Sequence, residues 1–235
     1  FKPGKPRLVI FAAGPPFHAL YNLRRSQEQL IDWLLENTDG LVQQLEQCDV
    51  PQTKQLCAHI SNEILTDLEN EPKHEKLLLN LVQRLIAVEA TNDVGVFLRG
   101  NQTATAIFLA TIIKRPSVIN YLQTVIKHAL DKKHANDPAK LCICVLNSLR
   151  AHTLPKELEI INTQIALAAP EKLSGFFFLR CLNPTIVTYE GAPTEFLIDT
   201  ARLLQKFAQQ NVNFLQDPLL DKPDRLRSLV SRLSD

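Results

Sequence analysis

Arg99 and Arg180 stand in the two settings of this sequence where the residue types could support chemistry. Arg99 lies in the stretch Phe97-Leu98-Arg99-Gly100-Asn101, which comes after turn-forming residues at 90–95 and is predicted to be a loop. Arg180 lies in an aromatic and aliphatic run directly before Asn183-Pro184. Taken alone, Arg99 is an arginine on a short glycine-containing loop and indicates no specific chemistry. Arg180 is more informative because of its apolar surroundings.

The setting of Arg180 leaves two interpretations open. A charge inside an apolar helix must be paired or hydrogen-bonded, because an unsatisfied buried charge is very costly. The five donors of the guanidinium of Arg180 would then hold backbone carbonyls of a neighbouring loop. The alternative is a solvent-facing arginine whose stem covers apolar surface. The composition of the segment favours neither interpretation over the other.

Other kinds of site are not predicted. The six histidines form no ligand pair at helical spacing, so we expect no metal. There is no Gly-x-x-x-x-Gly-Lys motif, so we expect no nucleotide bound by the chain itself and no cofactor. A formal net charge of +1 argues against a general nucleic-acid binder. The five cysteines show no metal-type spacing and fit buried free thiols in a reducing compartment.

The elements that must position these arginines are predicted to be helices. The chain has 235 residues, 45% of them apolar, only seven glycines and no period-2 alternation, which favours an all-α fold. We expect an extended proline-rich segment at 1–22 and a single helical bundle-like domain at 23–235. Asn183-Pro184 is expected to end its helix. Apolar spacing and proline positions predict helices at 27–36, 53–68, 74–90, 102–113, 118–130, 139–151, 155–167, 171–182, 194–210 and 224–233.

Three stretches, in the correct order, resemble the Ras GTPase-activating (RasGAP) domain family. The segment from Ser174 to Val187 resembles the family signature, with Phe-Leu-Arg followed by Asn-Pro and with Thr185 in place of the usual alanine. The stretch from Phe97 to Thr105 is similar to the finger loop of the family, placed here at about 94–102. The stretch 201–208 resembles a family helix that carries lysine at the place of Arg202. The resemblance implies a RasGAP-type fold with its signature helix at about 171–187.

The resemblance also implies a function and a set of site residues. Arg99 would be an arginine finger supplied in trans to a GTP-bound Ras-family GTPase, an interaction worth about 10³–10⁵ in rate. Arg180 would be the secondary arginine that holds the finger loop. Arg202 is expected either to pair with an acidic residue of this chain or to meet the acidic switch surface of the GTPase. The alternative is an ordinary exposed helix arginine. The residues expected to contact the GTPase are Phe97, Leu98, Gly100, Asn101, Leu179, Asn183, Pro184 and Arg202.

In this interpretation the protein is an activator without independent catalytic activity, and GTP and Mg²⁺ belong to the GTPase. One rival is a scaffold that keeps the RasGAP fold and binds a GTP-loaded Rho- or Ras-family GTPase without activating it. A second rival is an all-α adaptor with no GTPase partner.

We expect a cytoplasmic location and no direct membrane insertion. The sequence shows neither a signal peptide nor an apolar run long enough to span a bilayer. The chain begins at Phe1 and contains no methionine, which leads us to expect a fragment of a longer protein. Any recruitment to a membrane would then come from regions outside this chain.

Overall fold

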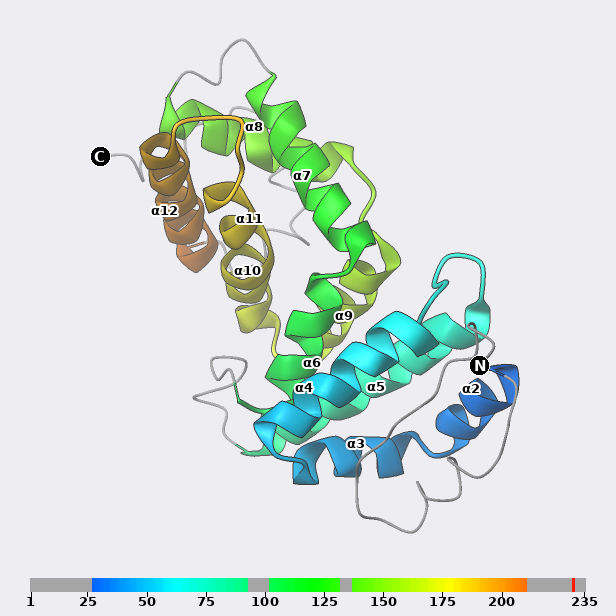
Figure 1. Cartoon of the computed structure of the whole chain (residues 1–235). Coiled ribbons are helices and arrows are strands. Elements are labelled where there is room, and N and C mark those ends of the chain that lie inside the picture. The colour runs from blue at the N-terminus through cyan, green and yellow to red at the C-terminus, as the bar shows by residue number, and fades with distance from the viewer. Residues whose placement is uncertain (1–26, 93–101, 132–136, 211–229, 231–235) are drawn as a thin grey trace. The chain divides into compact units, whose positions relative to one another are not determined.

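The structure, a computed structural model, describes residues 27–92, 102–131, 137–210 and 230 (Figure 1). All regular elements among these residues are helical, which confirms the all-α prediction. The chain groups into two compact units, Phe1–Arg115 and Pro116–Asp235, and each is described by itself. The predicted domain at 23–235 spans both units, and its RasGAP type stays a prediction. Within the described residues, no helix combines the length and apolar character needed to cross a membrane.

The first unit is built around one long helix, α5. Helices α2 and α3 pack on α5, and α6 packs against both α4 and α5. Thr105 Oγ1 in α6 donates to the carbonyl of Leu85 in α5 at 2.9 Å, so a buried hydroxyl joins these two helices. The elements of this unit are α2 (Gln27–Glu36), α3 (Thr38–Gln47), α4 (Val50–His59), the π-helical turn η1 (Ile60–Ile64), α5 (Pro72–Asn92) and α6 (Ala104–Ile113).

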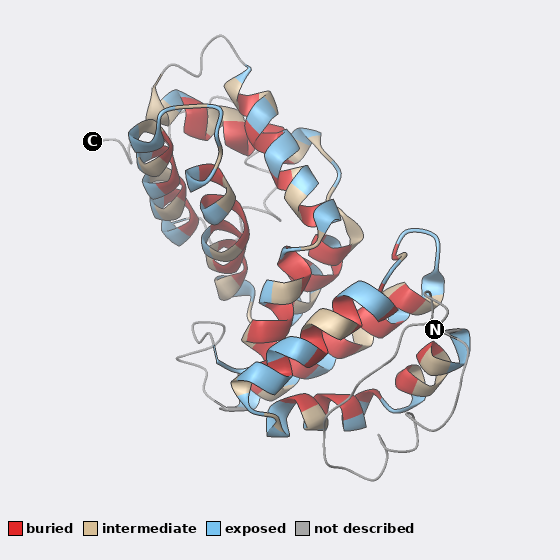
Figure 2. Cartoon of the chain, viewed as in Figure 1, coloured by how far each residue is buried: buried red, intermediate tan, exposed pale blue. Residues whose placement is uncertain are grey.

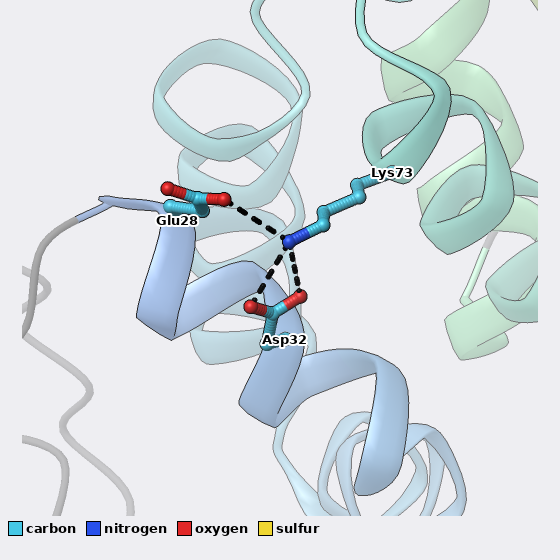
Figure 3. A network of polar contacts seen from close by, with 3 residues as sticks. All are labelled: Glu28, Asp32 and Lys73. Carbon is cyan, nitrogen blue, oxygen red and sulfur yellow. Dashed lines mark hydrogen bonds and ion pairs between the residues drawn. The ribbon is translucent and has the colours of Figure 1, made fainter.

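A surface ion-pair network joins α2 to the first turn of α5 (Figure 3). Lys73 Nζ lies 3.2 Å from Glu28 Oε1 and 2.8 Å from Asp32 Oδ1. The two acids are four residues apart on α2, so one face of that helix presents both to the lysine. Because the network is exposed, it contributes little stability, and the buried stripe of α2 through Ile31 and Leu34 contributes more.

The second unit packs its helices around buried aliphatic and aromatic side chains (Figure 2). Helix α8 packs against α7 and α12, and α12 lies beside α10 and α11 (Figure 1). Asp137 caps α8 by accepting the N–H of Lys140 at 2.8 Å, and this bond lowers the pKa of its carboxyl group. The elements are α7 (Pro116–Leu130), α8 (Pro138–Ala151), α9 (Lys156–Ala168), the 3₁₀ turn η2 (Pro170–Lys172), α10 (Leu173–Phe176), the π-helical turn η3 (Phe177–Leu182), α11 (Asn183–Val187) and α12 (Thr194–Gln210).

Several predicted boundaries are wrong by a few residues. Helix α4 begins at Val50 because Asp49 accepts the N–H of Gln52 and Pro51 fits the first turn. Helix α5 continues through the turn formers that begin at Ala90 and ends at Asn92. Helix α3 was not predicted. The helix predicted at 224–233 lies outside the described residues except for Val230, which is helical and buried.

Candidate functional site

The segment that contains Arg180 is one continuous helical path with a π-helical turn in its middle. The N–H of Asn183 donates to the carbonyl of Phe178, five residues earlier, as in a π-helix. Pro184 has no N–H to donate, and in an α-helix its ring would collide with the carbonyl of Arg180. The wider turn ends just before Pro184, which then occupies the first turn of α11, where a missing N–H costs nothing. The stop predicted at Asn183-Pro184 is therefore wrong, and the helical path continues to Val187, the end expected for the signature helix at about 171–187.

Aromatic side chains fix the inner face of this path against α12. The ring of Phe178 meets that of Phe177 edge to face at a centroid distance of 5.7 Å and that of Phe207 in α12 at 6.3 Å. All three rings are fully buried. Cys181 is also buried, and the loss of water around its thiol raises the pKa. The buried rings therefore hold the inner face of the path against α12.

The outer face of the path is apolar and exposed. Leu179 is 44% exposed and Val187 is 37% exposed, and Pro184 between them is exposed as well. Leu179 and Pro184 are five residues apart, about one π-turn, and Val187 comes three residues later. We call these three residues the η3–α11 stripe. Exposed apolar side chains are typical of interaction surfaces when they form one patch.

Asn183 lies on the inner side, although it was predicted to contact the GTPase. It is 9% exposed, and its Nδ2 donates to the carbonyl of Ala201 in α12 at 3.1 Å. Its Oδ1 is buried and has no hydrogen-bond partner among the described residues. Asn183 therefore joins α11 to α12 through this hydrogen bond.

Arg180 and Arg202 occupy different environments. Arg180 is half-buried. Its exposure thus lies between the two predicted alternatives, a buried arginine that holds a loop and a solvent-facing arginine. The side chain of Arg202 is 72% exposed, and its Nη1 lies 2.9 Å from Asp199 Oδ1 one turn earlier on α12. Arg202 therefore pairs within its own chain, which is one of its predicted alternatives. Sequence inspection missed Asp199, which the i,i+3 spacing of opposite charges could have indicated.

The predicted finger residues Phe97, Leu98, Arg99, Gly100 and Asn101 lie outside the described residues. The structure describes the helices that flank them, α5 ending at Asn92 and α6 beginning at Ala104. Thr103 caps α6 by accepting the N–H of Ala106 at 3.1 Å. The roles of the five residues stay predictions.

Among the described residues, no three metal-ligating side chains come together. None of the five cysteines forms a disulfide; Cys57, Cys142 and Cys181 are buried, as predicted, whereas Cys48 and Cys144 are partly exposed. Burial raises the pKa of Cys57 to about 12, so this thiol stays protonated and unreactive.

Comparisons with protein-family models, curated proteins and solved structures gave no match for this chain.

Proposed function

We propose that this protein is a GTPase-activating protein of the RasGAP type, which inserts Arg99 into the nucleotide site of a GTP-bound Ras-family GTPase. The observation that carries this proposal is the exposed η3–α11 stripe beside Arg180, in the segment whose sequence resembles the RasGAP signature. A helix with a π-helical turn is a frequent feature of functional sites. Here the turn presents Leu179 outward, while Phe177, Phe178, Cys181 and Leu182 are buried.

The mechanism depends on the charge that develops during GTP hydrolysis. Water attacks the γ-phosphorus while the bond to the β–γ bridging oxygen breaks, and negative charge builds on that oxygen and on the γ-oxygens. A guanidinium supplied in trans donates hydrogen bonds to these oxygens and excludes water, which stabilises the transition state more than bound GTP. Arg99 is assigned this role, and Arg180 the role of holding the loop that carries it.

The η3–α11 stripe would supply apolar contact area to the GTPase, and Arg202 an electrostatic contact. The ion pair between Arg202 and Asp199 is exposed on both sides, with side chains 72% and 55% exposed. Because such a pair contributes below about 1 kcal/mol, Arg202 can exchange Asp199 for an acidic residue of the GTPase at little cost.

Single-turnover GTP hydrolysis by a panel of Ras, Rap, Rho and Rac proteins tests the proposal. We expect at least one member to hydrolyse GTP about 10³-fold faster or more when the domain is saturating. Binding of a GTP-loaded member without acceleration would instead identify a RasGAP-fold scaffold. If no member binds or responds, the proposed function is wrong.

A further inference from the structure

We propose that Asn183 is a positioning residue that couples Arg180 to Arg202, and that it makes no contact with the GTPase. This inference rests on the proposed function, because it assigns a role within the same site. It differs from the expectation from sequence, in which Asn183 touches the partner.

The hydrogen bonds of Asn183 reach both arginine-bearing elements. Its main-chain N–H donates to Phe178 and closes the π-turn that contains Arg180. Its side-chain Nδ2 donates to the carbonyl of Ala201, and that carbonyl belongs to the peptide unit that joins Ala201 to Arg202. One residue therefore fixes the backbone on which each arginine side chain is mounted.

The burial of Asn183 strengthens this link. The bond to Ala201 is shielded from water, where a hydrogen bond is electrostatically stronger than at the surface. The amide also leaves its Oδ1 buried without a partner among the described residues, which is a destabilising arrangement. An amide retained at that cost is consistent with a need for the Nδ2 donor at this position.

The same burial argues against direct contact with the GTPase. A partner cannot reach an atom enclosed between α11 and α12 without separating those helices. The neighbouring side chains of Leu179 and Pro184 are exposed and available instead. In this proposal, the exposed apolar residues contact the GTPase, and the buried Asn183 aligns the backbone of α11 with that of α12.

The test compares Asn183→Ala with the matched control Asn162→Ala. Asn162 lies in α9 of the same unit and is 7% exposed, and neither of its side-chain polar atoms has a partner among the described residues. Both changes truncate a buried asparagine, but only the first removes a bond to α12. Maximal GTPase acceleration and the half-saturating domain concentration are measured for both variants. Asn183→Ser, whose hydroxyl is too short to reach Ala201, repeats the test if Asn183→Ala does not fold.

Asn183→Ala keeps the main-chain N–H that closes the π-turn but loses the bond to Ala201. It is expected to lower maximal acceleration about tenfold, because α11 loses its tie to α12, and to raise the half-saturating concentration about threefold or more, because the backbone that carries Arg202 is no longer held. Asn162→Ala should leave both values near those of the parent. In the parent, the effects of Arg180→Ala and Arg202→Ala should be non-additive, and in the Asn183→Ala background they should become additive. Unchanged acceleration, additive arginine effects in the parent, or an effect on half-saturation alone would overturn the proposal.

Amide hydrogen exchange provides a readout that needs no GTPase. Asn183→Ala should raise exchange in α12 around Ala201 to Gln205 about tenfold, and Asn162→Ala should not. If the parent activates no GTPase but this difference appears, the proposed function fails while the link between the helices stands. If the parent activates a GTPase and exchange in α12 does not respond, the coupling role of Asn183 fails alone.

Discussion

Among the described residues, π-helical turns occur in both units, and the two turn different side chains toward solvent. In η1 the outward positions are the polar residues Asn62 and Glu63, while Ile60 and Ile64 are buried. In η3 the aromatic residues are buried and the outward position is Leu179. Two similar turns of backbone therefore present a polar surface in one unit and an apolar surface in the other.

The two turns also differ in how the chain continues beyond them and in the position of an arginine. η1 ends a helix, because the chain leaves it at Leu65, and the carbonyl of Ser61 accepts a hydrogen bond from Nη1 of Arg115. η3 lies in the middle of a helical path and contains Arg180 itself. An arginine from outside thus satisfies the backbone of η1, while η3 carries an arginine within it. In the proposed function, η1 therefore serves folding and η3 contributes to recognition of the GTPase.

The largest effect on stability should come from the buried side of η3. Phe178→Ala is expected to lower the free energy of unfolding by about 3–5 kcal/mol, because it removes a fully buried ring that packs against Phe177 and Phe207. The adjacent Leu179→Ala should change it by less than about 0.5 kcal/mol while weakening GTPase binding. Urea denaturation of the two variants measures the difference, and equal destabilisation would contradict the division of η3 into two faces.

The next largest effects should distinguish Arg115, which bonds to η1, from Arg180, which lies within η3. Arg115→Ala should cost about 1.5–3 kcal/mol of stability, because the Ser61 carbonyl loses a charged donor, and should leave GTPase acceleration intact. Arg180→Ala should cost less stability and lower acceleration. Lys114→Ala, at an exposed neighbouring position, is the control for Arg115. Chemical denaturation and single-turnover hydrolysis on the same samples decide the matter, and a loss of acceleration in Arg115→Ala would remove the distinction between the turns.

Pro184→Ala tests why η3 is π-helical. The substitution adds an N–H that can donate to Arg180 in an α-helical pattern, so the turn can tighten and Leu179 can rotate. We expect a stability change within about 1 kcal/mol, since the added bond offsets the greater freedom of the unfolded chain. Acceleration should fall by less than in Arg180→Ala. Pro170→Ala, at the start of η2, is the matched control, and an equal response of the two variants would show that Pro184 has no special role.

The smallest effect is a pH dependence at the entrance of η1. His59 precedes this turn, and its pKa is lowered by burial, with the charge of Glu63 acting in the opposite direction. The unfolded chain therefore binds a proton more readily, so stability should decline modestly as pH falls through about 6.5 and level off below the folded pKa. His59→Gln should flatten the profile below about pH 7. Thermal melts across that window measure it, and an unchanged slope in the variant would refute the assignment.

Strong local patterns made part of the fold predictable. Helices α2 and α12 begin and end at the predicted residues, because their apolar positions have helical spacing. Helix α3 was missed because Gly40 and several polar residues weaken its pattern, although Leu41, Val42 and Leu45 are buried. Only contacts with neighbouring helices show that this weak segment folds as a helix.

Only part of the candidate site could be predicted from the sequence. The sequence indicated Leu179 and Pro184 as contact residues, and both are exposed as that role requires. It could not show that Asn183 is buried, because its partner Ala201 lies 18 residues away on another helix. Apolar spacing and the proline predicted a stop at Asn183-Pro184, whereas the signature helix that the resemblance implies, at about 171–187, ends where the helical path does, at Val187. The burial of Asn183 depends on tertiary packing, which spacing along the chain does not encode.

The measurement that tests the central claim most directly is single-turnover GTP hydrolysis by a responsive GTPase with saturating parent, Arg99→Ala and Arg99→Lys domains. Affinity for the GTP-bound partner is measured separately on the same proteins. We predict that Arg99→Ala loses about 10³-fold or more of the acceleration while its affinity changes only a few-fold, with Arg99→Lys only partly active because lysine lacks the planar fork of donors. Acceleration by Arg99→Ala equal to that of the parent would contradict the claim that Arg99 is the catalytic arginine.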